Sequence, residues 1–201
     1  MNYSKYKVTR MFNLAYELAF ETKAREQDWT DIFNLWLCAA TAGHTRAQYY
    51  LGTCYDSGLG TEKDVQLAFE WYIKAAKQGH RDSQYNIGFF YHKGELVKQD
   101  YKKAVYWYSL GSAQGHFDSH RDLGYCYFYG EGVEVDLPKA VQLYKKAARY
   151  NDDKALLNLG FCYKNGHGVS QSNRWAKYYF TKAKLYGNRR AKKQLKEIEG
   201  N

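Results

Sequence analysis

Four cysteines and six histidines are the side chains of this sequence best suited to nucleophilic, redox or metal chemistry. Cys54, Cys126 and Cys162 occupy one position of a 36-residue pattern, and Cys38 stands apart from them. Structural zinc sites draw on cysteine pairs separated by about two to four residues, a spacing that these cysteines lack. We therefore expect free thiols that fill small spaces in a core or groove, without a zinc site.

The histidines give no stronger indication of metal binding or catalysis. Three of them follow a glycine at one repeat position, which favours a role in turns or helix caps: His44, His80 and His116. The other three have no Cys, Asp or Glu at the spacing that helical ligands need: His92, His120 and His167. Loop glycines such as Gly130 and Gly132 lack the Gly-Lys-Ser/Thr of a phosphate cradle. We expect no catalytic residue, metal or cofactor, and no enzyme.

The elements that position these residues follow from an internal repeat. A glycine recurs every 36 residues, at Gly52, Gly88, Gly124 and Gly160. An apolar residue precedes each glycine and a tyrosine follows three residues later, which places them on one stripe of a helix. A second helix in each unit is predicted by good N-cap residues, Asp64, Asp100, Asp136 and Ser172. Each unit is thus a helix hairpin, and stacked hairpins share a core as a solenoid.

These units predict an all-α protein, an α-solenoid of about five helix-hairpin repeats with a C-terminal capping helix. We expect a single domain over residues 1–201, because the chain has one proline and no low-complexity stretch. Its parts are a degenerate N-terminal repeat (1–46), four repeats (47–82, 83–118, 119–154 and 155–187) and a cap (188–201). Equivalent helices of neighbouring units should lie farther apart than the ~7 Å between Cα atoms that a disulfide allows, so the cysteines are not expected to pair.

The segment Ala47–His80, AQYYLGTCYDSGLGTEKDVQLAFEWYIKAAKQGH, resembles the Sel-one-like repeat (SLR) family within the tetratricopeptide-repeat-like superfamily, as do its copies that begin SQYNIGFFYHKG and LGYCYFYGEG. The resemblance covers residues 28–187 and departs from the family pattern at Leu96, Gly111 and Asn151. It implies a right-handed superhelix whose first helices line a concave groove, and a role as scaffold, adaptor or inhibitor in protein complexes. Some small bacterial members are immunity proteins that neutralise a secreted antibacterial toxin.

If the glycine stripe faces the core, the helical positions between its members face the groove. Many hold aromatic residues, which suit protein hot spots because they bury a large area at little cost in rotamer entropy. We predict partner binding by Tyr49, Tyr85, Asn86, Phe89, His92, Lys93, Arg121, Tyr125, Phe128, Tyr129, Asn158 and Phe161. The resemblance implies that the two asparagines bind the backbone of an extended peptide, and we expect Arg121 and Lys93 to pair with acidic partner groups. The alternative for Thr53, Phe89, Tyr125 and Phe161 is packing between neighbouring first helices.

These features predict a non-catalytic scaffold that binds a protein partner in its groove, most concretely a bacterial immunity protein and its toxin. A signalling or assembly adaptor is an alternative. Nucleic-acid binding is another, because the formal net charge is +9 and its excess lies in residues 173–201. It is disfavoured, because acidic residues interrupt any basic track on the predicted groove: Asp56, Asp82, Asp118 and Asp122.

The location is predicted from what the sequence lacks. No run approaches the roughly 20 apolar residues that cross a bilayer. Asn13 and Glu17 interrupt the apolar run near the N-terminus, which argues against a signal peptide. We expect a soluble, cytoplasmic protein that is a monomer when free of its partner.

Overall fold

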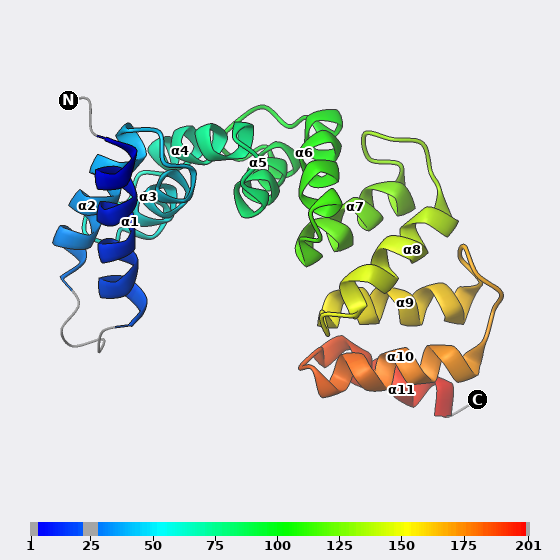
Figure 1. The fold of residues 1–201 in the computed structure, drawn as a ribbon. Coiled ribbons are helices and arrows are strands. Elements are labelled where there is room, and N and C mark those ends of the chain that lie inside the picture. The colour runs from blue at the N-terminus through cyan, green and yellow to red at the C-terminus, as the bar shows by residue number, and fades with distance from the viewer. Residues whose placement is uncertain (1–3, 22–27, 200–201) are drawn as a thin grey trace. The chain divides into compact units, whose positions relative to one another are not determined.

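The computed structural model describes residues 4–21 and 28–199, and every helix or strand in these ranges is an α-helix. The eleven helices are α1 Lys5–Phe20, α2 Trp29–Thr41, α3 Thr45–Ser57, α4 Val65–Lys77, α5 Arg81–Lys93, α6 Tyr101–Ala113, α7 Phe117–Tyr129, α8 Leu137–Ala148, α9 Asp153–Asn165, α10 Asn173–Leu185 and α11 Arg189–Glu199 (Figure 1). The predicted all-α repeat fold with a C-terminal helix is confirmed. Within the described residues, no helix combines the length and the apolar character that crossing a membrane requires.

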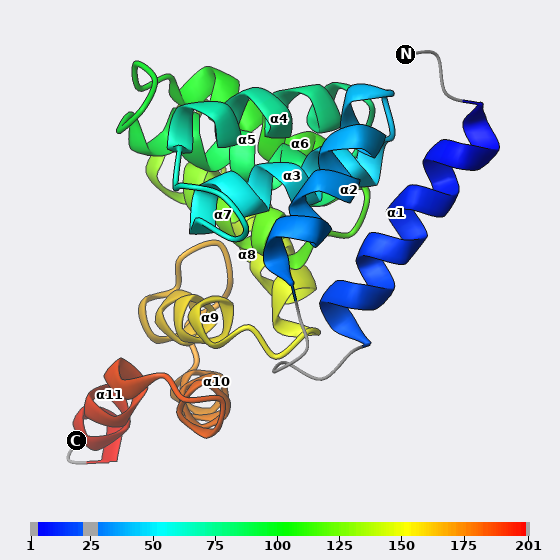
Figure 2. The ribbon, with the colours of Figure 1, turned by 90° about the vertical axis from the view of Figure 1, so that its left-hand side faces the viewer.

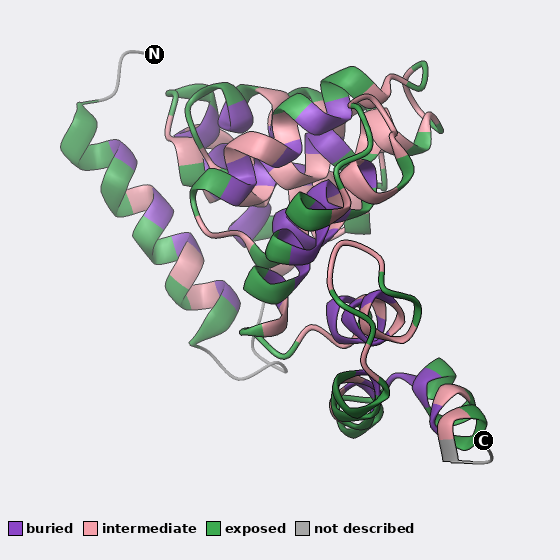
Figure 3. Ribbon diagram, turned by 90° about the vertical axis from the view of Figure 1, so that its right-hand side faces the viewer, coloured by how far each residue is buried: buried purple, intermediate pink, exposed green. Residues whose placement is uncertain are grey.

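The chain divides into two compact units. Unit 1 comprises Met1–Phe90 and Glu95–Lys98, and unit 2 comprises Tyr91–Gly94 and Gln99–Asn201. Within unit 2, α10 packs against both α9 and α11 (Figures 1 and 2). Buried positions recur along the packed sides of the helices (Figure 3). The single domain over residues 1–201 stays a prediction.

The second helices begin where the sequence predicts. In each repeat a side-chain oxygen accepts from the backbone N–H three residues further on, at 2.9–3.3 Å, and the four acceptors are Asp64, Asp100, Asp136 and Ser172. Such a cap satisfies one of the donors that the first turn leaves free, and it typically contributes about 1 kcal/mol. The boundary between loop and helix is therefore set locally in every repeat.

The first helices are capped by the residue that follows the turn. Nδ1 accepts from the backbone N–H three residues on at 3.2–3.3 Å, which confirms the predicted capping role of His44, His80 and His116. Asp152 takes this position in α9 and accepts from the N–H of Ala155 at 2.6 Å. Asn188 takes it in α11, where its side-chain oxygen accepts from the N–H groups of Arg190 and Ala191. The C-terminal helix therefore starts like the first helix of a further repeat.

The recurring glycine of the first helices makes room for an aromatic ring of the second helix. A Cβ atom at Gly160 would lie 2.3 Å from a ring carbon of Phe180. One at Gly124 would lie 2.9 Å from the ring of Tyr144 and 3.3 Å from the carbonyl oxygen of Ala140. The buried ring is therefore the larger part of what the glycine accommodates.

Departures from the repeat pattern differ in their consequences. Asn151, which replaces a turn glycine, is the only non-glycine among the described residues with positive φ, at 60°, so it keeps the left-handed turn. Leu96 replaces the second loop glycine and does not adopt that conformation. Its counterpart Gly132 has φ of 74°, and a Cβ there would lie 2.4 Å from the backbone of Tyr101. The loop at Leu96 therefore follows a different path from its counterparts.

A buried polar side chain ties α3, α5 and α7 each to the hairpin before it. Gln48 and Gln84 each donate to a backbone carbonyl eight residues earlier, at 3.2 Å. His120 takes this position in α7, with Nδ1 2.7 Å from Oγ of Ser112. Burial, together with the charge of Lys146, lowers the pKa of His120, so the folded protein favours the neutral imidazole.

We expect His120→Gln, which copies the residue of the two earlier repeats, to weaken the pH dependence of stability. Because the folded-state pKa of His120 is lowered, its contribution is complete above the ordinary value of 6.5 and is lost as the pH falls through the folded-state value. Thermal unfolding followed by circular dichroism between about pH 7 and pH 5 measures this. The lowered pKa of His44 leaves part of the dependence in both proteins. Identical pH profiles would contradict the role of His120.

Candidate functional site

Two adjoining cavities in unit 2 are lined mainly by α7, α9 and α11. One, of about 330 Å³, is lined by Arg121, Asp122, Tyr125, Asp153, Lys154, Leu157, Asn158, Asn188 and Arg190. The other, of about 290 Å³, is lined by Phe128, Tyr129, Tyr144, Asn158, Phe161, Asn165, His167 and Arg190. Asn158 and Arg190 line both cavities, which makes them one continuous surface. We call these residues the α7–α9–α11 surface.

Aromatic rings border this surface and remain accessible. Tyr129 is 59% exposed and Tyr125 is 37% exposed, and their ring centroids lie 4.4 Å apart. The ring of Phe128 lies 4.9 Å from that of Tyr129 and 5.5 Å from that of His167. Rings that support one another lose little freedom when a partner covers them, which suits a binding hot spot.

Polar groups lie between and beside the rings. The half-buried Asn158 offers an amide with both donor and acceptor capacity where the two cavities meet. Arg190 and Lys154 are exposed, and within the part of the chain that the structure describes the Arg190 guanidinium has no ion pair. Asp153 is already engaged, because its carboxylate accepts from Nδ2 of Asn188 at 2.9 Å. The surface therefore offers free cationic groups and one central amide.

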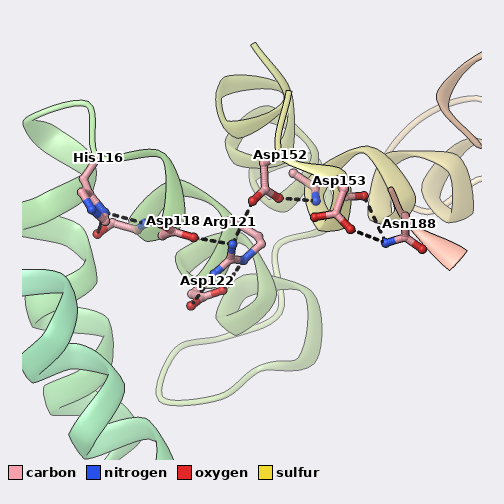
Figure 4. Close-up of polar contacts among 9 residues, drawn as sticks. His116, Asp118, Arg121, Asp122, Asp152, Asp153 and Asn188 are labelled. Carbon is pink, nitrogen blue, oxygen red and sulfur yellow. Dashed lines mark hydrogen bonds and ion pairs between the residues drawn. The ribbon is translucent and has the colours of Figure 1, made fainter. Parts of the chain in front are cut away.

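Arg121 is already paired with acidic groups of its own chain, which the sequence did not suggest. It is 8% exposed, and two aspartates of α7 and Asp152, the N-cap of α9, surround its guanidinium (Figure 4). Nε of Arg121 lies 2.7 Å from a carboxylate oxygen of Asp122. Nη1 lies 2.9 Å from a carboxylate oxygen of Asp152 and also contacts the carboxylate of Asp118. The expected pairing of Arg121 with acidic groups of a partner is thus corrected, because acidic groups of its own chain already satisfy it.

The three surrounding carboxylates keep the Arg121 guanidinium positively charged. Burial on its own would lower the pKa of Arg121, but the hydrogen bond to Asp122 and the three carboxylate charges raise that pKa above its ordinary value. Asp152 also caps α9 through Ala155. Arg121 therefore joins α7 to α9 and holds the two walls of the first cavity together.

The other predicted residues are distributed between the units. In unit 1, Tyr49 stacks on His80 at 4.5 Å and is half-buried, so it serves its own repeat. Phe89 is 40% exposed, with its ring 6.4 Å from that of Tyr85. Asn86 is half-buried in the same helix. The cavities described above are lined by residues of unit 2 alone.

The packing alternative for four groove positions is resolved residue by residue. Phe161 packs on the buried ring of Phe180, with centroids 5.2 Å apart, and Thr53 is half-buried. Phe89 and Tyr125 keep more than a third of their area exposed. Packing therefore explains Phe161 far better than it explains Phe89 or Tyr125.

His92 and Lys93 lie at the end of α5, within unit 2. Lys93 is exposed, whereas Nε2 of His92 lies 2.8 Å from a carboxylate oxygen of Glu131. Cys126 adds a sulfur atom to this pair. Spacing within one helix did not reveal the cluster, because Glu131 lies 39 residues after His92 in the next repeat. A search one repeat further on would have found it.

Three of the four cysteines are buried thiols. All four are free, as the sequence predicts. Burial raises the pKa of Cys54, Cys126 and Cys162 to about 12, so their thiols are protonated near neutral pH. Because the thiolate is the reactive form, these three side chains are poor nucleophiles while they stay protonated.

Residues of the C-terminal helix were missed as part of the site. Arg190 and Asn188 line the cavities, although the sequence suggested only a basic cap at 188–201. The repeat register contained the signal, since Arg190 falls four repeats after Arg46, which lies three residues before the predicted groove residue Tyr49 on the same helix face. Lys154 falls at the same position one repeat earlier. Continuing the register through the capping segment would have placed both on the surface.

Comparison with known proteins identifies the repeat. The family model described as Sel1 repeat matches residues 45–80, 81–116, 118–152 and 153–185. No curated protein sequence matches the chain.

Solved structures of similar proteins share the fold. A Sel1 repeat protein from Oxalobacter formigenes is 30% identical, with a TM-score of 0.85 over 95% of this chain and 76% of that chain. The protective antigen c5321 of uropathogenic Escherichia coli, which displays an SLR fold, is 31% identical, with a TM-score of 0.86 over 95% of this chain. This chain spans 41% of c5321. Cysteine rich protein B of Helicobacter pylori is 24% identical, with a TM-score of 0.50 over 66% of this chain and 95% of that chain, and this shows likeness of fold alone.

The matched repeats cover more than half of the sequence and take in the helices from α3 to α10, apart from the first residue of α7. Repeats of this kind indicate a scaffold for protein–protein interaction. The chain belongs to the Sel1 repeat family.

Proposed function

We propose that this chain is a non-catalytic protein-binding module and that its partner binds at the α7–α9–α11 surface. The observation that carries the proposal is the placement of exposed Tyr125 and Tyr129 beside two adjoining cavities with Asn158 at their centre. Aromatic anchors next to pockets, with a few convergent polar groups, are typical of binding hot spots. The Sel1 repeats support the same class of function.

The charges of this surface favour a partner segment with both apolar and acidic groups. Arg190 and Lys154 offer cationic groups for a carboxylate. Asn158 is suited to the backbone of an extended segment, since its amide can donate and accept at once. Asp122 and Asp153 line the same cavity, which disfavours a phosphate backbone there.

Binding to a secreted antibacterial toxin is the most concrete form of this function, and it rests on the resemblance to Sel-one-like repeat proteins. Calorimetry with the purified chain and a toxin encoded beside it in the genome tests this form. Absence of a complex would exclude that partner class and leave the binding surface to be tested with proteins captured from the host.

The surface itself is tested with two matched double variants. We expect Tyr125→Ala/Tyr129→Ala to weaken binding of the captured partner about 30-fold or more, because hot-spot truncations cost about 2 kcal/mol or more. Tyr106→Ala/Tyr178→Ala removes two exposed tyrosines from the second helices α6 and α10 and should bind as the wild type does. Affinity capture with mass spectrometry, followed by calorimetry with the purified partner, measures both. Equal binding by both variants would overturn the assignment of the surface.

A further inference from the structure

His92, Cys126 and Glu131 bring three different ligand groups to one point of unit 2. One imidazole nitrogen, one sulfur and one carboxylate oxygen all lie within 4.8 Å of one another. They come from the end of α5, from α7 and from the loop after α7. Ligand groups from three separate segments converge here, and within the described residues this is the one group of three or more such side chains so placed.

The sulfur and the carboxylate are held by the backbone that ends α7. The N–H groups of Gly130 and Glu131 both donate to the carbonyl oxygen of Cys126, at 2.9 and 3.0 Å. Gly132 packs so tightly on Tyr101 that a Cβ would lie 2.4 Å from its backbone carbonyl carbon. The loop is therefore fixed at both sides of Glu131.

The imidazole is held by aromatic rings. The His92 ring contacts Tyr101, Tyr108 and Tyr125, with centroids 5.4, 6.2 and 6.1 Å away. Nε2 of Gln99 donates to the backbone carbonyl of His92 at 2.9 Å. The ring orientation that brings Nε2 to Glu131 is thus set by packing, and ligand groups held in advance favour metal binding.

The donor set matches a borderline-soft divalent cation. Zinc binds thiolate at about 2.3 Å, imidazole nitrogen at about 2.0–2.1 Å and carboxylate oxygen at about 2.0–2.2 Å, so small side-chain movements would bring these three groups around one ion. A thiolate and a carboxylate balance the two positive charges. The His92 and Glu131 side chains are 21% and 24% exposed, which leaves room for water as a fourth ligand.

We propose that His92, Cys126 and Glu131 form a site for one zinc-class divalent cation. On binding, the Cys126 thiol releases its proton to solvent, the sulfur bonds to the metal, and metal bonds replace the contact between His92 and Glu131. The site goes beyond the proposed partner surface and does not depend on it. No reaction is assigned to the ion, which would tie α5 to α7.

The repeat supplies a matched control. Cys162 occupies the same repeat position as Cys126 and is equally buried. The residues one repeat after His92 and Glu131 are Phe128 and His167, so one of the three ligands is missing there. If a metal ion bound any buried thiol, it would bind Cys126 and Cys162 alike. The proposed site requires binding at Cys126 alone.

Cobalt titration of the reduced, metal-free full chain tests the site, because Co²⁺ reports on its ligands by absorption. We expect one equivalent to give a thiolate-to-cobalt charge-transfer band and intense visible bands, and zinc to remove both. Cys126→Ser should lose the charge-transfer band, and Cys162→Ser should keep it. Glu131→Gln, in a surface loop, should weaken cobalt binding at least about tenfold without unfolding the protein.

Thermal unfolding gives a readout that does not use the cobalt spectrum. Zinc should raise the Tm of the wild type and of Cys162→Ser, because a ligand of the folded state stabilises it. It should leave the Tm of Cys126→Ser unchanged. A wild type without the charge-transfer band, or a band that survives Cys126→Ser, would overturn the proposal, and so would loss of the band in Cys162→Ser.

Discussion

Gly168→Ala is expected to lower the free energy of unfolding by about 2–5 kcal/mol. Gly168 has φ of 69°, and a Cβ there would lie 2.4 Å from the backbone carbonyl of Leu137. A left-handed conformation costs an L-residue roughly 1–2 kcal/mol, and overpacking typically adds about 1–3 kcal/mol. Because the contact is with backbone at the start of α8, no side chain can rotate away to relieve it. Urea unfolding followed by circular dichroism measures the loss.

Gly166→Ala, two residues earlier, is the control. Gly166 also has positive φ, at 73°, but the nearest atom to an added Cβ lies 3.5 Å away, an ordinary contact. We expect the free energy of unfolding to fall by only about 1–2 kcal/mol, which is the cost of the left-handed backbone conformation alone. Equal losses in the two variants would show that the close approach of this loop to α8 does not contribute to stability.

Arg121→Met is expected to cost about 3–5 kcal/mol of stability, similar in size to the loss in Gly168→Ala. The change removes the one cation that three aspartates share and leaves their charges close together and partly buried. Breaking a buried ion pair by removing one partner is strongly destabilising for this reason. Arg174→Met, at an exposed position of α10, should change stability by about 0.5 kcal/mol or less. Similar effects of the two changes would contradict the role of the cluster.

A double variant separates charge from packing in this cluster. Asp152→Asn removes one charge but keeps an oxygen that can cap α9, since Asn is as good an N-cap as Asp. Each single variant should lower the free energy of unfolding. We expect the double variant Arg121→Met/Asp152→Asn to lower it by less than the two single effects added together, by a margin of at least about 0.5 kcal/mol, because the two side chains interact directly. Strict additivity in urea unfolding would show that Arg121 acts through packing alone.

Local sequence signals predicted the repeat helices and the residues at which the second helices begin. A cap such as Asp64 and a turn glycine such as Gly58 act through backbone groups a few residues away. These features depend on no distant contact. The repeat then carried the same assignment through the chain, and even Asn151 kept the glycine conformation of its position.

The site was harder to predict because its contacts run between helix hairpins. Arginine is usually exposed, and Arg121 occupies a predicted groove position. Its guanidinium is nevertheless buried, because it also pairs with Asp152, which lies 31 residues further on. His92 likewise meets Glu131 from the next repeat. The periodicity identified which side chains share a helical stripe. It did not show which residues of neighbouring helix hairpins pair with one another, and that pairing decides whether a charged side chain is available to a partner.

Site-specific photocrosslinking with the full chain tests most directly whether the α7–α9–α11 surface binds the partner. A photoreactive phenylalanine analogue would replace either Tyr129, beside the cavities, or Tyr106, an equally exposed tyrosine of α6. We expect a covalent adduct with the partner from position 129 and none from position 106. An adduct from position 106 without one from position 129 would contradict the assignment and move the binding site to the second helices.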